Sequence, residues 1–271
     1  MGGSPGPDSW DDPRAAEAYG EIAAEGVLYR FLAGMLVDLV DPRPGERILD
    51  LAAGTGIVSE RLLARAGPDL LLALADGSRE MLRVALCRLP PGAAGAVVTR
   101  PGALPFRDRV FDGGTCSAAL WHFVPLGECF REIARVLRPG GRFAWNVPAA
   151  QLGDVPDLPP TPLQVALARE GERRFHREPA PAGPVRRRED LLALAREAGL
   201  EPCGERLDDV EVPARELADL VRLPAFGGRL YPVAPLAERD AWIDAALARV
   251  APGETHPVRW WSCAVRKREN A

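Results

Sequence analysis

The sequence predicts an α/β fold: a doubly wound, mostly parallel seven-stranded sheet with N-terminal helices and helical insertions. Short apolar segments alternate with amphipathic ones from residue 47 onward, and the first apolar segment runs directly into a glycine-bearing turn. Alternation at this spacing is typical of βαβ units, whose crossovers are right-handed. The 271 residues suit one such domain with additions, and we find no internal repeat.

The apolar segments give the strands. The second of them is continuously apolar, as parallel strands buried on both faces are. We expect strands at 47–51, 70–75, 96–98, 110–118, 142–147, 203–210 and 259–265.

Helical periodicity fills the intervals between these strands. Two helices are expected before the turn-forming segment Asp41-Pro42-Arg43-Pro44-Gly45. Ser78 can cap a later helix, and Pro139-Gly140-Gly141 ends another. The expected helices lie near 13–26 and 28–40, after Thr55, after Ser78, around 130–137, at 188–198 and over most of 213–250.

Composition and charge disfavour several classes of protein. The net charge of −4 lacks the basic footprint of a dedicated nucleic-acid binder, so no nucleic-acid partner is expected. No apolar run approaches the roughly 18 residues of a membrane span, and the N-terminus does not read as a secretory signal. The five cysteines form no CxxC pair, which favours reduced thiols, a cytoplasmic location and no metal site.

The sharpest feature is the segment Ile48-Leu49-Asp50-Leu51-Ala52-Ala53-Gly54-Thr55-Gly56. A strand runs into small residues, and a helix starts at once, so its N–H groups can meet a nucleotide-like ligand. A dinucleotide-binding loop would need a third glycine where Ser59 stands, which makes an oxidoreductase the weakest alternative. A strand-to-helix turn without a ligand is another interpretation of this segment.

A second acidic residue, Asp76, ends the second strand twenty positions after Gly56 (76 − 56 = 20). Adjacent parallel strands end at one edge of the sheet, so Asp76 lies beside the first loop. A carboxylate there can accept hydrogen bonds from both ribose hydroxyls of a nucleoside. The alternative is a helix cap or an exposed acid in a turn.

These segments resemble the class I S-adenosylmethionine (SAM)-dependent methyltransferases, and the UbiE or type 11 group among them. The similar motifs are ILDLAAGTG at 48–56, D-x-S-x-x-M-L at 76–82, LPF…FD within 104–112 and EI-x-RVLRPGG at 132–141. The resemblance covers residues 13–147 well and the remainder loosely. It implies SAM as cofactor, S-adenosylhomocysteine as product, and methyl transfer to O, N or C of a small-molecule acceptor, with specialised metabolism as one setting.

The resemblance also implies a cofactor site along the sheet edge. The methionine end of SAM would lie over Gly54 and Gly56 with Asp50 beneath its ammonium group, and Met81 would pack near the ribose or adenine. Tyr19 would contact SAM from an N-terminal lid. The expected cofactor residues are Tyr19, Asp50, Ala52, Ala53, Gly54, Thr55, Gly56, Asp76, Gly77, Met81, Arg100, Pro101, Gly102, Ala103 and Ser117.

Adenine recognition departs from the family pattern. Where the family has an aspartate and a small residue, counting back from Leu104 gives Arg100 and Pro101. Arginine accepts no hydrogen bond and proline has no N–H. Either Arg100 contacts adenine differently, or the register shifts to Gly102 and Ala103, or SAM binding is weak or lost. The last option supports an alternative function, a methyltransferase-fold protein that binds SAM or its product without methyl transfer, or has lost the ligand.

His122 is the candidate for chemistry, because it follows the fourth strand at the ligand-binding edge of the sheet. It could act as a general base or orient an acceptor hydroxyl, and it could equally be structural and close the cofactor pocket. His176 with Arg186, Arg187 and Arg188 could attract an anionic acceptor, or form a solvated surface.

The chain is expected to divide into a flexible lead at 1–12, N-terminal helices with the SAM-binding half at 13–147, and a proline-rich insertion or acceptor cap at 148–187. The C-terminal half of the same domain follows at 188–271, with a helical insertion at 211–252. We expect a monomer or homodimer.

Overall fold

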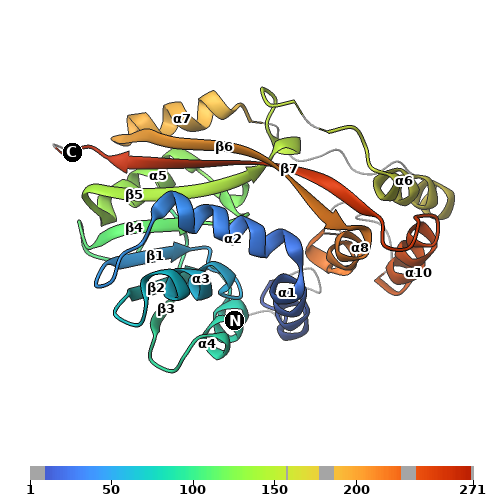
Figure 1. Ribbon diagram of the computed structural model, residues 1–271, viewed down its shortest axis with the longest axis horizontal. Coiled ribbons are helices and arrows are strands. Elements are labelled where there is room, and N and C mark those ends of the chain that lie inside the picture. Colours follow the sequence, from blue (N-terminus) through green and yellow to red (C-terminus); the bar gives the residue numbers. More distant parts are fainter. Residues whose placement is uncertain (1–9, 157, 177–185, 227–235, 270–271) are drawn as a thin grey trace, which may run out of the picture.

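The computed structural model describes residues 10–156, 158–176, 186–226 and 236–269. One seven-stranded sheet runs through the molecule in the order β3-β2-β1-β4-β5-β7-β6 (Figure 1). The first five strands pair in parallel, and β7 is antiparallel to both β5 and β6. The predicted fold class is therefore confirmed. The strands are β1 Arg47–Leu51, β2 Leu71–Asp76, β3 Ala94–Val98, β4 Phe111–Cys116, β5 Leu137–Pro148, β6 Leu200–Pro213 and β7 Thr255–Lys267.

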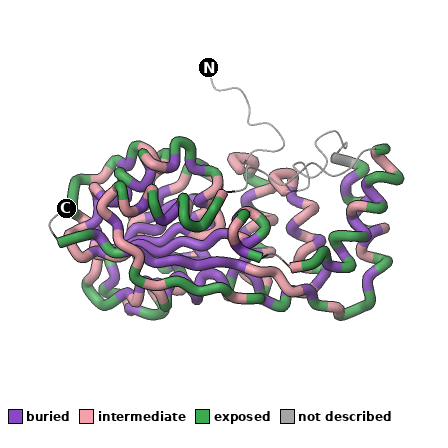
Figure 2. The backbone as a smooth tube through the Cα atoms, turned by 90° about the horizontal axis from the view of Figure 1, so that it is seen from above, coloured by how far each residue is buried: buried purple, intermediate pink, exposed green. Residues whose placement is uncertain are grey.

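Helices cover both faces of this sheet. The helices are α1 Pro13–Glu25, α2 Val27–Val40, α3 Ile57–Ala66, α4 Arg79–Arg88, α5 Leu126–Val136, α6 Pro162–Phe175, α7 Arg188–Glu197, α8 Ala214–Arg222 and α10 Leu236–Leu247, with short 3₁₀ helices η1 Leu120–His122 and η2 Ala149–Gln151. A hydrophobic core lies on each face of the sheet, and alternate residues of a strand point into opposite cores. In β1, Leu49 packs with α5 and α7, and Ile48 packs with α2 and α3. The buried sheet between exposed helices is visible in Figure 2.

A third, smaller core lies at one end of the molecule. It joins α6, α8 and α10 around Trp242, which is fully buried and donates its indole N–H to the Leu167 carbonyl at 2.8 Å (Figure 1). The strands β6 and β7 extend into this region, because they pair continuously from Leu200–Lys267 to Pro213–Thr255.

Helix α8 is also tied to the N-terminal helices. The Glu216 carboxylate accepts the backbone N–H groups of Val27 and Leu28, at 2.8 and 2.9 Å. It thereby satisfies two N–H groups at the start of α2, which have no partner within that helix. A Cβ on Gly26 would lie only 2.5 Å from the Glu216 carboxylate, so this junction requires glycine.

The structure differs from the sequence prediction in the lead segment and in the insertion at 148–187. Of the expected flexible lead, residues 1–9 lie outside the described part. Trp10 to Asp12 are fixed by two hydrogen bonds. The Trp10 carbonyl accepts the Ser78 hydroxyl, and the Asp11 carboxylate accepts the Arg79 N–H. Within the insertion at 148–187, where we expected little regular structure, α6 begins behind a reciprocal cap between Thr161 and Gln164.

Candidate functional site

The glycine loop, residues 52–56, lies at the point where the sheet reverses its strand order. Strand β1 has β2 on one side and β4 on the other, and ligands bind at such switch points, outside the carboxyl ends of the strands. The loop turns through three residues with positive φ, at 55° for Ala52, 52° for Gly54 and 83° for Gly56. Gly56 then caps α3. The local geometry is the strand–turn–helix that the sequence predicts.

Asp76 faces this loop from the end of β2. Its two carboxylate oxygens accept the backbone N–H groups of Gly54 and Ser78, each at 2.8 Å. Burial raises the pKa of Asp76, although the backbone hydrogen bonds from Ser78, Gly54 and Gly77 oppose that shift. Each carboxylate oxygen can accept a further hydrogen bond, so the group can hold a ligand while it fixes the loop.

Asp50 lies beneath the glycine loop rather than on its surface. Its side chain is buried, with 1% of the residue exposed, and it accepts the hydroxyls of Ser59 at 2.6 Å and Thr115 at 3.0 Å. Burial raises the pKa of Asp50 to about 6, although the same hydroxyl hydrogen bonds oppose the shift. The sequence analysis identified neither Ser59 nor Thr115 as a partner, since both read as ordinary helix and strand residues.

Tyr19, on α1, lies directly over the loop. A Cβ added to Gly54 would sit 3.8 Å from the Tyr19 ring, so this position has room between loop and lid. The Tyr19 ring is held edge-on between Trp10 and Tyr29, with centroid distances of 5.4 and 5.3 Å. Burial is the main cause that raises the Tyr19 pKa well above its usual value, so its phenol stays neutral.

Arg88 links this lid to the loop. Its guanidinium donates to the carbonyl of Thr55, in the loop, and to the carbonyl of Gly20, in α1, both at 2.9 Å. Gly20 permits the close approach of the helices, because a Cβ there would lie 3.0 Å from Val84. No motif pointed to Arg88, which occupies an ordinary position in the last turn of α4.

The segment after β3 forms a tight turn with two open backbone donors. The Thr99 N–H donates to the Asp76 carbonyl at 2.8 Å, and the Ala103 N–H donates to the Arg100 carbonyl at 3.1 Å. Arg100 is exposed, and Pro101 has no N–H. Within the described residues, the N–H groups of Arg100 and Gly102 make no hydrogen bond, so both are backbone donors that this turn can offer to a ligand.

This turn is held from α5. The Glu132 carboxylate accepts the Leu104 N–H at 2.8 Å, and Arg135 donates to the carbonyls of Leu104 and Phe106 at 2.9 and 2.8 Å. Glu132 and Arg135 of the EI-x-RVLRPGG motif thus fix the neighbouring loop. At Gly141 an added Cβ would lie 2.8 Å from the Arg138 carbonyl, so its turn needs glycine.

The residues that follow β4 form the remaining part of the carboxyl edge of the sheet. The Ala118 N–H donates to the fully buried Asn146 side chain at 2.7 Å, and the Asn146 amide approaches the Ser117 hydroxyl at 3.5 Å. Met81 is buried at the start of α4, whereas Gly77 is exposed. The cofactor residues expected from the sequence therefore come from the ends of β1, β2, β3 and β4 and from the lid helix.

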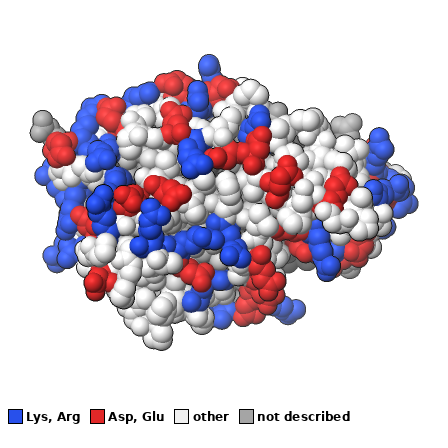
Figure 3. Space-filling model, viewed as in Figure 1, with Lys and Arg blue, Asp and Glu red and all other residues white. Residues whose placement is uncertain are grey.

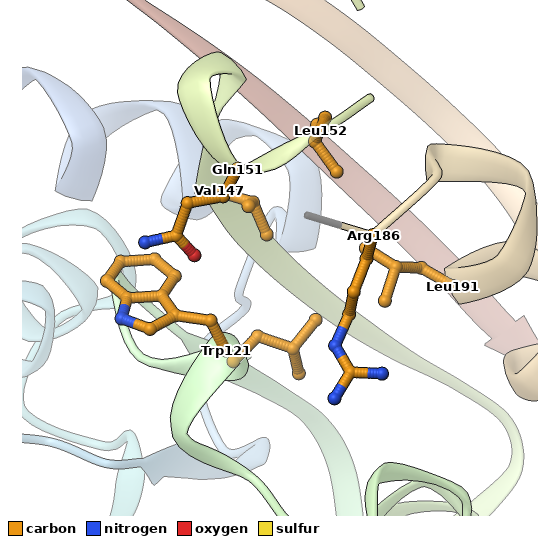
Figure 4. Close-up of a pocket in the computed structure, with 7 residues that line it drawn as sticks. Trp121, Val147, Gln151, Leu152, Arg186 and Leu191 are labelled. Atoms are coloured by element: carbon orange, nitrogen blue, oxygen red, sulfur yellow. The ribbon is translucent and has the colours of Figure 1, made fainter. Parts of the chain in front are cut away.

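His122 lies outside this group of expected cofactor residues. It ends η1 as an exposed residue, and its ring lies 5.4 Å from that of Trp121. A small, shallow pocket, partly open to solvent, lies beyond η1 (Figure 4). Trp121 lines this pocket and His122 does not. The lining residues are Leu120, Trp121, Val147, Gln151, Leu152, Arg186 and Leu191.

Comparison with known proteins identifies the family. Residues 49–145 match the family described as a methyltransferase domain, of type 11. A UbiE ubiquinone/menaquinone biosynthesis C-methyltransferase of Ectopseudomonas oleovorans is 33% identical over 149 residues, which are 50% of this chain and 88% of that protein. The chain belongs to the class I methyltransferase family. A UbiE of Ectopseudomonas mendocina is 34% identical over 149 residues, but these are 58% of its length and 50% of this chain.

Solved structures support the same methyltransferase fold. The [4+2]-cyclase SpnF has a TM-score of 0.61 at 17% identity, with 97% of each chain covered. Phosphoethanolamine N-methyltransferase 2 of Haemonchus contortus, solved with S-adenosylhomocysteine, has a TM-score of 0.60 at 16% identity and covers 96% of this chain and 60% of its own. At such identities these structures show the shared fold alone.

The remaining features of the described residues concern membrane spans, metal ligands and surface charge. None of the described helices has both the length and the apolar character needed to traverse a bilayer. No group of three or more His, Cys, Asp or Glu side chains in the described ranges could hold a metal ion. Acidic and basic side chains are mixed on the face that Figure 3 shows.

Proposed function

We propose that the protein is a SAM-dependent methyltransferase that acts on a small-molecule acceptor at O, N or C. The observation that carries this proposal is the Asp76 carboxylate, which faces the glycine loop at the switch point and holds the Gly54 N–H at 2.8 Å. Its remaining acceptor capacity suits a ribose with two hydroxyls. Family membership and the C-methyltransferase names of the relatives support it, and favour carbon as the methylated atom.

The residues present fit SAM. Gly54 and Gly56, with Ala52, Ala53 and Thr55, would receive its methionine end, in the space under Tyr19 that a Cβ on Gly54 would fill. Asp50 would act beneath the ammonium through its charge alone, because its side chain is buried.

The adenosine end would lie between β2 and the turn after β3. Asp76, next to Gly77, would hold the ribose, and Met81 would pack beneath it. The Gly102 N–H would donate to a ring nitrogen of adenine beside Arg100, Pro101 and Ala103, in place of the N–H that Pro101 lacks. Ser117 would face the reactive end from β4.

SAM supplies a methyl group on a positively charged sulfur. The protein's own task is to hold an acceptor atom in line with that methyl group, since positioning supplies much of the rate of such displacements. The loop at the end of β4 is placed for this, because the Asn146 amide fixes Ser117 and Ala118 from the next strand. His122 would serve as a base where the acceptor must lose a proton, or help to close the pocket.

Isothermal titration with SAM and with S-adenosylhomocysteine tests the proposal directly. Saturable binding of both, with a rise in melting temperature, is the expected result. Production of S-adenosylhomocysteine from SAM in the presence of candidate acceptors would then establish transfer. Absence of both heat and thermal protection would overturn the proposal. A cytoplasmic location and a monomeric or dimeric state are part of the same proposal.

The alternative is a protein of this fold that binds SAM or its product without transferring methyl. The exposed Arg100 and the following Pro101, in place of the family's aspartate and small residue, are the observation that favours it. Replacement of Arg100 by Asp should then raise the affinity for SAM, and an unchanged affinity would argue against this alternative.

A further inference from the structure

The pocket beyond η1 has an unusual lining. Four of its seven residues are aliphatic, and Trp121 forms one wall. The polar groups are the Gln151 amide and the Arg186 guanidinium, and no lining residue is acidic. In Figure 4 the Trp121 ring and the Arg186 side chain face each other across the space, with the Gln151 amide directed towards the ring.

No acidic side chain in the described part of the chain pairs with the Arg186 guanidinium. Among the described residues it makes no hydrogen bond and no ion pair, although the residue is half-buried. The nearby Asp154 carboxylate is occupied elsewhere, because it accepts the N–H groups of Arg188 and Glu189 at the start of α7. A partly buried cation without a partner is costly, which indicates that the pocket is built for an anion.

Its position is fixed by the backbone. The Arg186 N–H donates to the Gln151 carbonyl at 3.0 Å, and the Arg186 carbonyl accepts the Gly153 N–H at 2.8 Å. These bonds pair Arg186 with η2 and with Leu152. The side chain therefore enters the pocket from a defined backbone position rather than from a free surface.

The two neighbouring arginines are different. Arg187 is exposed and does not line the pocket. Arg188 pairs with Glu205 at 3.5 Å. Of the three consecutive arginines, only Arg186 contributes to the pocket, so the charge there results from placement and not from the run of arginines as a whole.

We propose that this pocket binds the carboxylate of a planar acceptor, with Arg186 holding the carboxylate and Trp121, beside the Gln151 amide, holding the ring system. A single guanidinium matches one negative charge and forms two parallel hydrogen bonds with a carboxylate. The aliphatic lining excludes a more highly charged group such as a phosphate dianion, whose second charge would be left unpaired. Trp121 is braced by Trp260, at 6.1 Å between ring centroids, and offers a flat apolar wall.

This assignment rests on the proposed function, because it makes the pocket the acceptor side of the methyl-transfer site. The chain supports that placement: Leu120 and Trp121 follow directly after Ser117 to Ala119, the segment expected beside the reactive end of SAM. The pocket lies at the ends of β4 and β5, and the glycine loop lies at the ends of β1 and β4.

Binding of two probes of equal shape tests the proposal: 2-naphthoate, and its neutral amide, 2-naphthamide. Each is titrated into the full-length protein, alone and with saturating S-adenosylhomocysteine, and followed by calorimetry and ligand-observed NMR. We expect wild-type protein to prefer the carboxylate about tenfold or more, the effect of one charged hydrogen-bonding pair. Arg186→Gln should abolish this preference, Arg186→Lys should retain part of it, and the matched control Arg187→Gln should keep all of it.

Equal binding of the two probes to the wild type, no binding of either, or an unchanged preference in Arg186→Gln would each overturn the proposal. Melting temperatures confirm that the variants are folded. The two proposals fail separately. If S-adenosylhomocysteine binds but the carboxylate preference is absent, only the acceptor assignment is lost. If S-adenosylhomocysteine does not bind, the methyltransferase proposal is lost, and the titration of the protein alone still decides the chemistry of the pocket.

Discussion

The donor half, residues 47–147, and the acceptor side, residues 148–252, are built in different ways. In the donor half, side chains hold backbone groups of neighbouring loops, as Asp76 holds Gly54 and Glu132 holds Leu104. On the acceptor side, helices form a core of their own around Trp242, and the buried Glu170 carboxylate pairs with Arg173 and Arg249. The family match stops at residue 145, so the proposed donor site lies within the shared sheet, whereas the proposed acceptor pocket also takes Gln151, Leu152, Arg186 and Leu191 from added elements.

The largest effect should come from the centre of the donor half. Asp76→Asn replaces the carboxylate that holds the loop and, as proposed, both ribose hydroxyls. Loss of charged hydrogen bonds of this kind should weaken S-adenosylhomocysteine binding on the order of 100-fold by calorimetry.

Two controls sharpen this comparison of regions. Asp69→Asn changes an exposed acid before β2, and Trp242→Phe removes an indole hydrogen bond on the acceptor side. Both should leave the affinity for S-adenosylhomocysteine unchanged. An Asp76→Asn protein that binds like the wild type would contradict the assigned ribose site.

A second prediction concerns pH. The folded pKa of Asp50 is about 6 against 3.8 for the unfolded chain, so the unfolded state loses this proton first as the pH rises. The stability that this raised pKa provides is therefore complete below pH 3.8, falls between pH 3.8 and about 6, and is absent above that range.

Asp50→Asn removes this titration, so the melting temperature of the variant relative to wild type should rise from pH 4 to about pH 6 and stay level from there to pH 7. The change corresponds to at most about 3 kcal/mol. Melting curves of the two proteins across this range provide the measurement. A difference in melting temperature that does not change with pH would show that Asp50 does not titrate in this interval.

The smallest effect is expected at the adenine edge. Gly102→Pro removes the open N–H and should weaken S-adenosylhomocysteine binding by roughly tenfold or less, the cost of one neutral hydrogen bond. Gly102→Ala is the matched control, since an added Cβ has its nearest neighbour at 4.0 Å and the N–H is kept. If both variants lose the same affinity, or neither does, the backbone register assigned to adenine recognition is wrong.

The sequence predicts the donor half well, because its signals are local. A buried apolar strand, positive-φ glycines and an acid at the end of the next strand are each readable without knowledge of the fold. The contacts that support them were not readable. Arg88 joins residues 20 and 55 from a third element, and Ser59 and Thr115 meet Asp50 only after the sheet has formed.

The acceptor side was harder to predict. Prolines around residue 160 suggested an irregular insertion, although Thr161 and Gln164 carry the capping signal that begins α6. The strands β6 and β7 are longer than expected, because their outer ends pair with each other beyond the main sheet. The three arginines at 186–188 left their role open, since only the tertiary placement separates Arg186 from its neighbours.

The cap that Glu216 places on α2 also bears on the order in which the chain can assemble. The carboxylate that completes the Leu28 end of this helix is synthesised 188 residues after it. As a polypeptide leaves the ribosome from its N-terminus, the α1–α2 junction waits for α8 before its backbone is satisfied. The lid over the glycine loop therefore reaches its final form late in biosynthesis, after strands β1 to β6 of the sheet have been made.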